Sequence, residues 1–140
     1  MAHPGPPIRR RSDERGASLS AFVATVVVAL LLMGGLVIDG GRRSSADREC
    51  QQVATEAARA ATDAGAVARA AGVTPDPADL KRVAQSVVAT HPGLTASVVV
   101  TGGTIQVSTR RVVPTTFLSL IGVNQLEAGG QASVALLGTP

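Results

Sequence analysis

The sequence is almost without aromatic residues. It contains no Trp and no Tyr, and its two Phe are Phe22 and Phe117. A folded core must therefore consist of Val, Leu, Ile and Ala, which bury less apolar area per residue than aromatic side chains do. The lack of stacking residues, with Lys81 as the only lysine among 13 basic residues, also argues against nucleic-acid binding. We expect a domain of marginal stability.

Cysteine and histidine, which carry much of protein chemistry, are scarce as well. Cys50 is the only cysteine, so its thiol, which we place on an exposed helix, is either free or forms an intermolecular disulfide. The histidines, His3 and His91, have neither a nucleophile nor a metal-spaced partner near them in sequence. Glycine motifs that bind phosphate are also missing. The sequence therefore predicts no catalytic residue, no metal or cofactor site and no small-molecule substrate.

Formal charge is missing from one long segment. Residues Ala17 to Ile38 are uncharged and almost all apolar or glycine. At ~1.5 Å rise per residue, a helix of this length crosses the ~30 Å hydrocarbon core of a bilayer. We therefore expect a transmembrane helix over residues 17–38, with the lipid bilayer as its partner. Because the apolar part of a cleaved export signal is typically ~7–15 residues long, a retained anchor is favoured, and a removed signal is the alternative.

Arginines on the two sides of the span set its expected orientation by a narrow margin. Four precede it and three follow it within the usual window: Arg9, Arg10, Arg11 and Arg15, then Arg42, Arg43 and Arg48. Positive-inside counting makes residues 1–16 a disordered basic cytoplasmic arm and places the C-terminal part outside the cytoplasm. Asp39 is interpreted as the end of the lipid-facing segment, with a functional intramembrane carboxylate as the alternative.

Residues 39–72 are predicted to continue the span as an Ala-rich extracytoplasmic helix. Small apolar residues recur in it at three- and four-residue spacing, including Val53, Ala57, Ala61 and Ala64. Such a face suits close approach to a helix of another subunit. Packing on the chain's own domain is the equally weighted alternative.

Residues 73–140 are predicted to form a small exported domain. Asp76 can cap a short amphipathic helix that begins at Pro77. Period-two alternation from Leu94 onward indicates strands that reverse at Gly102-Gly103, and a last strand near residues 125–137 with a bulge at Gly129-Gly130. The fold class is therefore α+β: a transmembrane helix continuing into an Ala-rich helix, then a domain with a short antiparallel sheet.

Two stretches together resemble TadE/TadG-like proteins of the tight-adherence (Flp) pilus assembly system. Residues 15–65 have an Arg-Gly pair before the span, an Asp-Gly pair after it and then a Gln- and Ala-rich helix. Residues 112–136 have a Pro-Thr-Phe turn followed by a strand of alternating small residues. The resemblance implies a pilin-like fold and a non-catalytic, single-pass membrane component of a type IV-like pilus or secretion apparatus. Its partners would be other pilus subunits, contacted through the Ala-rich helix.

The resemblance also implies a processing site. In pseudopilins of this kind a prepilin peptidase cuts after a glycine, here Gly16, which would make Ala17 the new N-terminus. The glutamate found five residues into the mature family members is replaced by Ala21. No carboxylate then pairs with the new amine, so we expect an uncut anchor.

Two functions of other classes compete with this interpretation. One is a secreted or membrane-anchored binding protein, unrelated to pili, whose signal is cleaved. The other is an enzyme or redox protein that uses the thiol of Cys50.

Overall fold

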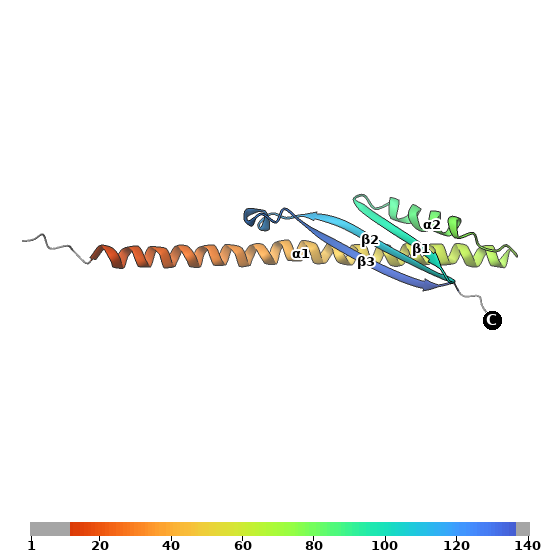
Figure 1. The fold of residues 1–140 in the computed structure, drawn as a ribbon, viewed down its shortest axis with the longest axis horizontal. Helices are drawn as coiled ribbons and strands as arrows, with labels where there is room; N and C mark the ends of the chain where they lie inside the picture. The colour runs from red at the N-terminus through yellow and green to blue at the C-terminus, as the bar shows by residue number, and fades with distance from the viewer. Residues whose placement is uncertain (1–11, 137–140) are drawn as a thin grey trace, which may run out of the picture.

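The computed structural model describes residues 12–136, with side chains from Ser18 onward. A single 59-residue helix, α1, runs from Ser12 to Ala70 and spans most of the length of the molecule (Figure 1). The remaining elements lie along its C-terminal half: α2 (Pro77–Ala89), β1 (Leu94–Thr101), β2 (Thr104–Pro114), the short 3-10 helix η1 (Leu118–Ile121) and β3 (Gln125–Ala135). The α+β class is confirmed.

The N-terminal end of α1 differs from the expectation. Residues 12–16, predicted to belong to a disordered arm, are helical. Extending an existing helix adds one hydrogen bond per residue without a new nucleation step, which explains why the helix continues into this polar stretch. Residues 1–11 lie outside the described residues.

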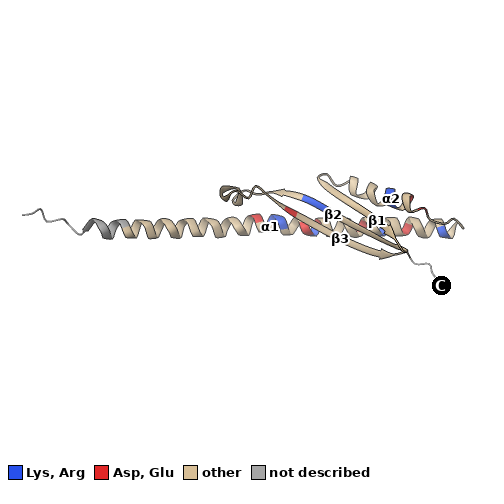
Figure 2. Cartoon of the chain, viewed as in Figure 1, with Lys and Arg blue, Asp and Glu red and all other residues tan. Residues whose placement is uncertain are grey.

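The first half of α1 has almost no contact with the rest of the chain. Between Ser18 and Ile38, Gly35 is the only buried residue. From Ser18 to Ile38 this half has no charged residue and is tan in Figure 2, and the next charged residue along α1 is Asp39. It is the one helix, among the described residues, that is long and apolar enough to cross a membrane. By length and composition it is compatible with a membrane anchor or a signal segment.

The second half of α1 forms one side of the hydrophobic core. Val53, Ala57 and Ala61 are buried against the sheet and α2. The other fully enclosed core members are Ala54, Ala58, Leu80, Ala84, Val88, Ile105 and Val107. Of the two alternatives for the Ala-rich face, packing within the chain's own domain is therefore the one observed. Residues 39–70 and 73–136 share one core, so the boundary predicted near residue 72 separates elements rather than independently packed units.

The three strands form an antiparallel sheet in the order β1-β2-β3. Gly102 and Gly103 connect β1 to β2 with φ angles of 57° and 74°, which a two-residue hairpin turn requires and glycine adopts without strain. Ile105, Val107 and Thr109 face the core from β2, as the alternation predicts. The N-cap of α2 is also confirmed, since the carboxylate of Asp76 accepts a hydrogen bond from the Ala78 amide at 2.8 Å.

The bulge predicted in β3 is not present. Gly129 and Gly130 pair with Arg110 and Thr109 in an unbroken register. Gly130 faces α1, where a Cβ would lie 2.3 Å from backbone atoms of Cys50 and the next residue. The glycine therefore permits close contact between a strand and a helix backbone, and does not mark an extra residue in the ladder.

Polar side chains of α1 cover the outer edge of β3. The Gly129 amide donates to Asp47 at 2.9 Å, and the Gln131 amide and carbonyl bond to the Gln51 side chain at 3.1 and 2.7 Å. Four helix residues rise ~6 Å and two strand residues ~6.8 Å, so the two spacings match. This pairing occupies backbone groups that an edge strand would otherwise offer to another chain.

Gly130→Ala should lower the free energy of unfolding by about 3 kcal/mol, because the new methyl group meets backbone that cannot move without separating β3 from α1. Gly129→Ala is the matched control. Its Cβ would lie 3.5 Å from the Thr109 carbonyl oxygen, an ordinary contact. Urea unfolding of the full chain in detergent, followed by circular dichroism, measures both. Equal midpoints for the two variants would contradict the close helix-strand contact.

Candidate functional site

The most distinctive polar contact lies where the apolar half of α1 ends. Asp39 is only 1% exposed. Its carboxylate accepts three backbone hydrogen bonds, from the amides of Thr116 at 2.9 Å, Phe117 at 2.9 Å and Leu118 at 2.8 Å. These amides are at the start of η1, where N–H groups have no partner within the helix. One carboxylate thus attaches a segment more than 70 residues away to α1.

A glycine one turn before Asp39 makes a second contact with the same segment. Gly35 is buried, and a Cβ built on it would lie 2.3 Å from the Cβ of Phe117. Glycine within a helix costs roughly 1 kcal/mol relative to alanine. Here it lets the Phe117 side chain lie directly on the helix backbone. Its neighbour Gly34 has no atom within 4 Å of the corresponding position.

Residues 115–124, which we call the η1 lobe, are also held by hydroxyl groups. Arg42 donates from Nη1 to Oγ1 of Thr116 at 2.6 Å. At the base of the lobe, the Thr115 amide donates to the carbonyl of Asn124 at 3.1 Å, and the Thr115 hydroxyl donates to the carbonyl of Val123. The lobe is therefore closed on itself and joined to α1 through Gly35, Asp39 and Arg42.

The hydrogen bonds to Asp39 have an electrostatic consequence. The amides of Leu118 and Thr116 stabilise the ionised carboxylate most, with smaller effects from Phe117 and the Arg42 guanidinium, and together they hold the pKa of Asp39 below its usual value of 3.8 despite partial desolvation. The group is therefore ionised at neutral pH. It acts as a permanent acceptor, not as a proton donor.

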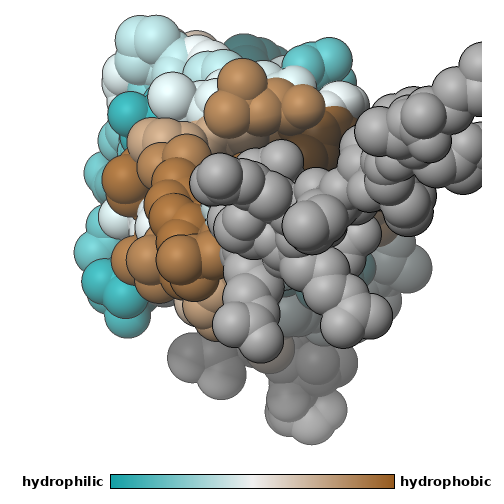
Figure 3. All heavy atoms as spheres, turned by 90° about the vertical axis from the view of Figure 1, so that its left-hand side faces the viewer, coloured by the Kyte–Doolittle hydropathy of each residue, from teal (hydrophilic) through white to brown (hydrophobic). Residues whose placement is uncertain are grey.

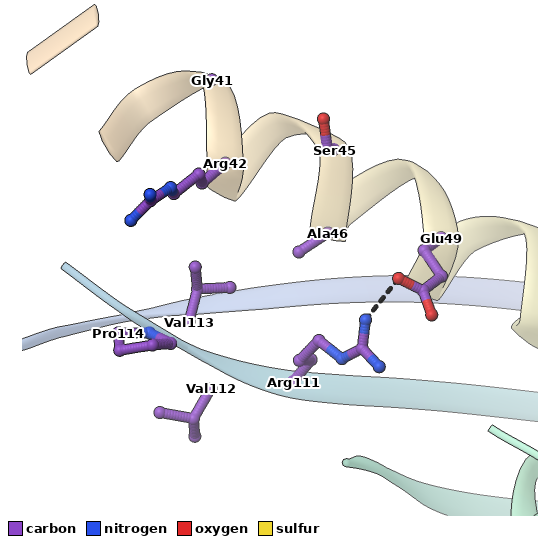
Figure 4. A pocket seen from close by; sticks show the side chains of 9 residues that line it. All are labelled: Gly41, Arg42, Ser45, Ala46, Glu49, Arg111, Val112, Val113 and Pro114. Carbon is purple, nitrogen blue, oxygen red and sulfur yellow. Dashed lines mark hydrogen bonds and ion pairs between the residues drawn. The ribbon is translucent and has the colours of Figure 1, made fainter. Parts of the chain in front are cut away.

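A pocket of about 590 Å³ lies next to this junction, between α1 and the end of β2 (Figure 4). It exists because β1 begins opposite Arg111, so the last residues of β2 have only β3 beside them. Its lining consists of Gly41, Arg42, Ser45, Ala46, Glu49, Arg111, Val112, Val113 and Pro114. Glu49 forms an ion pair with Arg111, whose Nη2 also donates to the Pro92 carbonyl at 2.6 Å. The charged groups of the wall are thus engaged in holding elements together.

Cys50 does not lie on an exposed surface, contrary to expectation. Its side chain is 0% exposed, enclosed by Ala46 and Ala128, and its carbonyl accepts a hydrogen bond from the Thr109 hydroxyl at 2.8 Å. The surroundings are apolar because the helix meets the sheet here. Burial raises the pKa of the Cys50 thiol, which disfavours the reactive thiolate. A disulfide with another chain would require α1 to separate from the sheet, so the arrangement fits a free, unreactive thiol.

The structure does not bring the other sequence-predicted residues into one site. Gly16 lies within α1, the side chains of Gly16 and Ala17 are outside the described part, and Ala21 is exposed on the helix. Cleavage after Gly16 stays a prediction. His91 lies at the end of α2 with Nδ1 3.3 Å from the Val87 carbonyl. Among the residues whose side chains are described, no group of His, Cys, Asp and Glu could hold a metal ion.

The sequence interpretation of Asp39 was incomplete. It placed Asp39 at the end of the lipid-facing segment and found no partner for it. The signal was present in the two stretches that carry the family resemblance, since Asp39 belongs to one and Thr116 and Phe117 to the other. Their separation along the chain concealed the contact.

Comparison of the chain with protein-family models, curated proteins and solved structures finds no match.

Asp39→Asn should release the start of η1, because a carboxamide has one acceptor oxygen and presents donors where the native oxygen accepts. We expect amide hydrogen exchange at Thr116, Phe117 and Leu118 to accelerate by tenfold or more, roughly. Exchange at Val107 in the core should stay unchanged. Asp47→Asn, which alters the Gly129 contact and an exposed ion pair with Arg43 but no contact of η1, is the matched control. Unchanged exchange at η1 in Asp39→Asn would contradict the role of the carboxylate.

The same contact predicts a pH dependence. Because folding lowers the pKa of Asp39, its stabilising effect is present above the unfolded value near 3.8 and is lost as pH falls through the lower folded value. Protection of the η1 amides should therefore be constant from neutral pH to about pH 4 and decrease below it. Exchange rates corrected for intrinsic pH effects measure this. Loss of protection near pH 6 would assign the effect to another group.

The Cys50 thiol should resist alkylation in the folded chain. A maleimide reagent should label it only after denaturant separates α1 from the sheet, because the side chain is enclosed and its pKa is raised. Mass spectrometry across a urea series measures the labelled fraction. Rapid labelling in buffer, or a disulfide-linked dimer under non-reducing conditions, would show that the thiol is accessible.

Proposed function

We propose that this chain is a non-catalytic, membrane-anchored component of a tight-adherence (Flp, type IV-like) pilus or secretion apparatus, of the TadE/TadG-like kind. The observation that carries the proposal is the contact between Asp39 and the amides of Thr116, Phe117 and Leu118. It joins the two separate stretches on which the family resemblance rests. The two stretches then occur together for a physical reason, because one supplies the carboxylate and the other supplies the amides that bond to it.

The proposed anchor is the apolar half of α1. From Ser18 to Ile38 all residues are exposed except Gly35, which is buried, and Ala29, which is half-buried. A lipid bilayer would remove this surface from water. With the Arg-rich N-terminus in the cytoplasm, the sheet and α2 lie on the extracytoplasmic side.

Retention of the anchor is supported by the η1 lobe. An ordinary signal cleavage after Ile38 would remove Gly35, on which Phe117 packs, and would leave Asp39 at a frayed chain end. The folded domain thus includes the last turn of the apolar segment. This favours an anchored protein over the alternative of a secreted binding protein.

Contacts with other pilus subunits are proposed for the outward face of the Ala-rich helix. Its small residues are occupied by the sheet and α2, so the face left for partners is polar. It consists of Gln52, Glu56, Arg59 and Asp63, spaced three or four residues apart and all exposed. Subunits of complementary charge would pack there.

N-terminal sequencing of the protein from membranes of its host tests the anchor. We expect a start at Met1 or Ala2 and resistance to extraction by alkaline carbonate. A start at Ala17 would indicate prepilin-type processing and a pseudopilin. A start beyond Ile38, or recovery in the soluble fraction, would contradict membrane anchoring.

A gene deletion tests the assignment to a pilus. Loss of surface pili and of adhesion, restored by the native gene, is expected. Complementation with a Glu56→Arg, Arg59→Glu variant should fail if the polar face binds partners, whereas Lys81→Glu on α2 should restore assembly. Normal pili in the deletion strain would contradict the proposed function.

A further inference from the structure

The η1 lobe exposes apolar side chains that the rest of the chain leaves uncovered. Leu120 is 80% exposed, Ile121 59% and Val123 39%. The whole stretch from Val112 to Leu126 contains no charged residue, and the lobe is uniformly tan in Figure 2. Exposed apolar residues grouped on one short segment indicate an interaction site.

The position of the lobe along α1 indicates what it contacts. It extends past the end of the sheet, alongside α1, toward the apolar half of the helix (Figure 1). Phe117 packs on Gly35, three residues inside the charge-free segment that ends at Ile38. At ~1.5 Å per residue, this contact lies ~4–5 Å within that segment.

The apolar surfaces of the helix and the lobe face the same end of the molecule. Leu36 and Val37 on α1 are 61% and 75% exposed at the same level. Viewed along the long axis, hydrophobic side chains gather at the end that carries the apolar half of α1 (Figure 3). Whatever solvates the helix at this level therefore also meets the lobe.

We propose that the η1 lobe inserts into the outer interfacial layer of the lipid bilayer beside α1 and is a second membrane contact of this chain. The inference rests on the proposed membrane anchoring. The bilayer is the occupant favoured by the continuity of the lobe with the anchor and by its lack of charge. Arg42 and Arg43 follow the span after three residues, close enough for their guanidinium groups to meet lipid phosphates.

This placement explains why the Asp39 carboxylate is so fully hydrogen-bonded. An ionised side chain at the edge of the hydrocarbon is costly unless its oxygens are hydrogen-bonded. The lobe supplies three amides and covers the carboxylate, leaving it 1% exposed. Two membrane contacts, a helix and a lobe on one side of it, would restrict rotation of the domain about the α1 axis.

The lack of tryptophan makes a direct test practical, since any introduced Trp is the only one in the chain. Three single variants of the full chain are reconstituted in phosphatidylcholine vesicles: Leu120→Trp in the lobe, Leu30→Trp in the anchor and Val99→Trp on β1. All three positions are exposed, so the fold should tolerate the change. Quenching by lipids brominated near the glycerol end or near the bilayer centre reports depth.

We expect emission from Leu120→Trp to fall roughly twofold with bromine near the glycerol end and little with bromine near the centre, as for side chains in the interfacial layer. Leu30→Trp should be quenched strongly by both lipids, and Val99→Trp by neither. Ile121→Trp should give the same quenching as Leu120→Trp. Agreement between the two variants would exclude an artefact of a single substitution.

The controls separate the two proposals. If Leu30→Trp is not quenched, membrane anchoring itself is wrong. If Leu30→Trp is quenched but Leu120→Trp and Ile121→Trp are not, the anchor stands and the lobe contact is overturned. A blue-shifted Leu120→Trp emission without quenching would mean that protein covers the lobe, which also overturns the proposal.

Discussion

The organisation of this chain depends on how one buried carboxylate is solvated. Asp39 directly follows an uncharged segment of α1 and is only 1% exposed, and the amides of its own helix are already used in helical hydrogen bonds. Three amides at the start of η1 provide the missing hydrogen bonds. Because they belong to one short segment, solvating the carboxylate also fixes that segment against Gly35 and Arg42. The segment is thereby attached where the apolar half of α1 meets the folded domain.

The two halves of the same long helix differ in composition and in burial. Its first half has large aliphatic side chains that remain exposed, and its second half has alanines that are enclosed by the sheet and α2. Small residues suit the second half because a strand backbone lies almost against the helix at Gly130. The core lacks the apolar area that Trp and Tyr would bury. Close backbone packing, and hydrogen bonds between the side chains of Asp47 and Gln51 and the edge of β3, stabilise the contact instead.

Local patterns could be read from the sequence, and contacts between distant segments could not. The cap at Asp76, the turn at Gly102-Gly103 and the inward face of β2 were predicted because each follows from neighbouring residues. The prediction of a bulge at Gly129-Gly130 was wrong. In sequence, a glycine pair that adds a residue to a strand cannot be distinguished from one that permits close contact with a helix. The burial of Cys50 was missed for a related reason, because periodicity shows that a helix has two faces but not which element covers each.

Hydropathy and charge alone establish the long apolar helix, because the length of the uncharged run and the position of Asp39 at its end are read directly from the order of residues. They also establish that the C-terminal part alternates as strands do. The partner of Asp39, the contact of Phe117 with Gly35 and the covering of the Ala-rich face emerge only in three dimensions. The first two contacts join residues more than 70 positions apart, and the Ala-rich face is covered by α2 and by strands that come later in the chain; no local pattern encodes which of these segments meet.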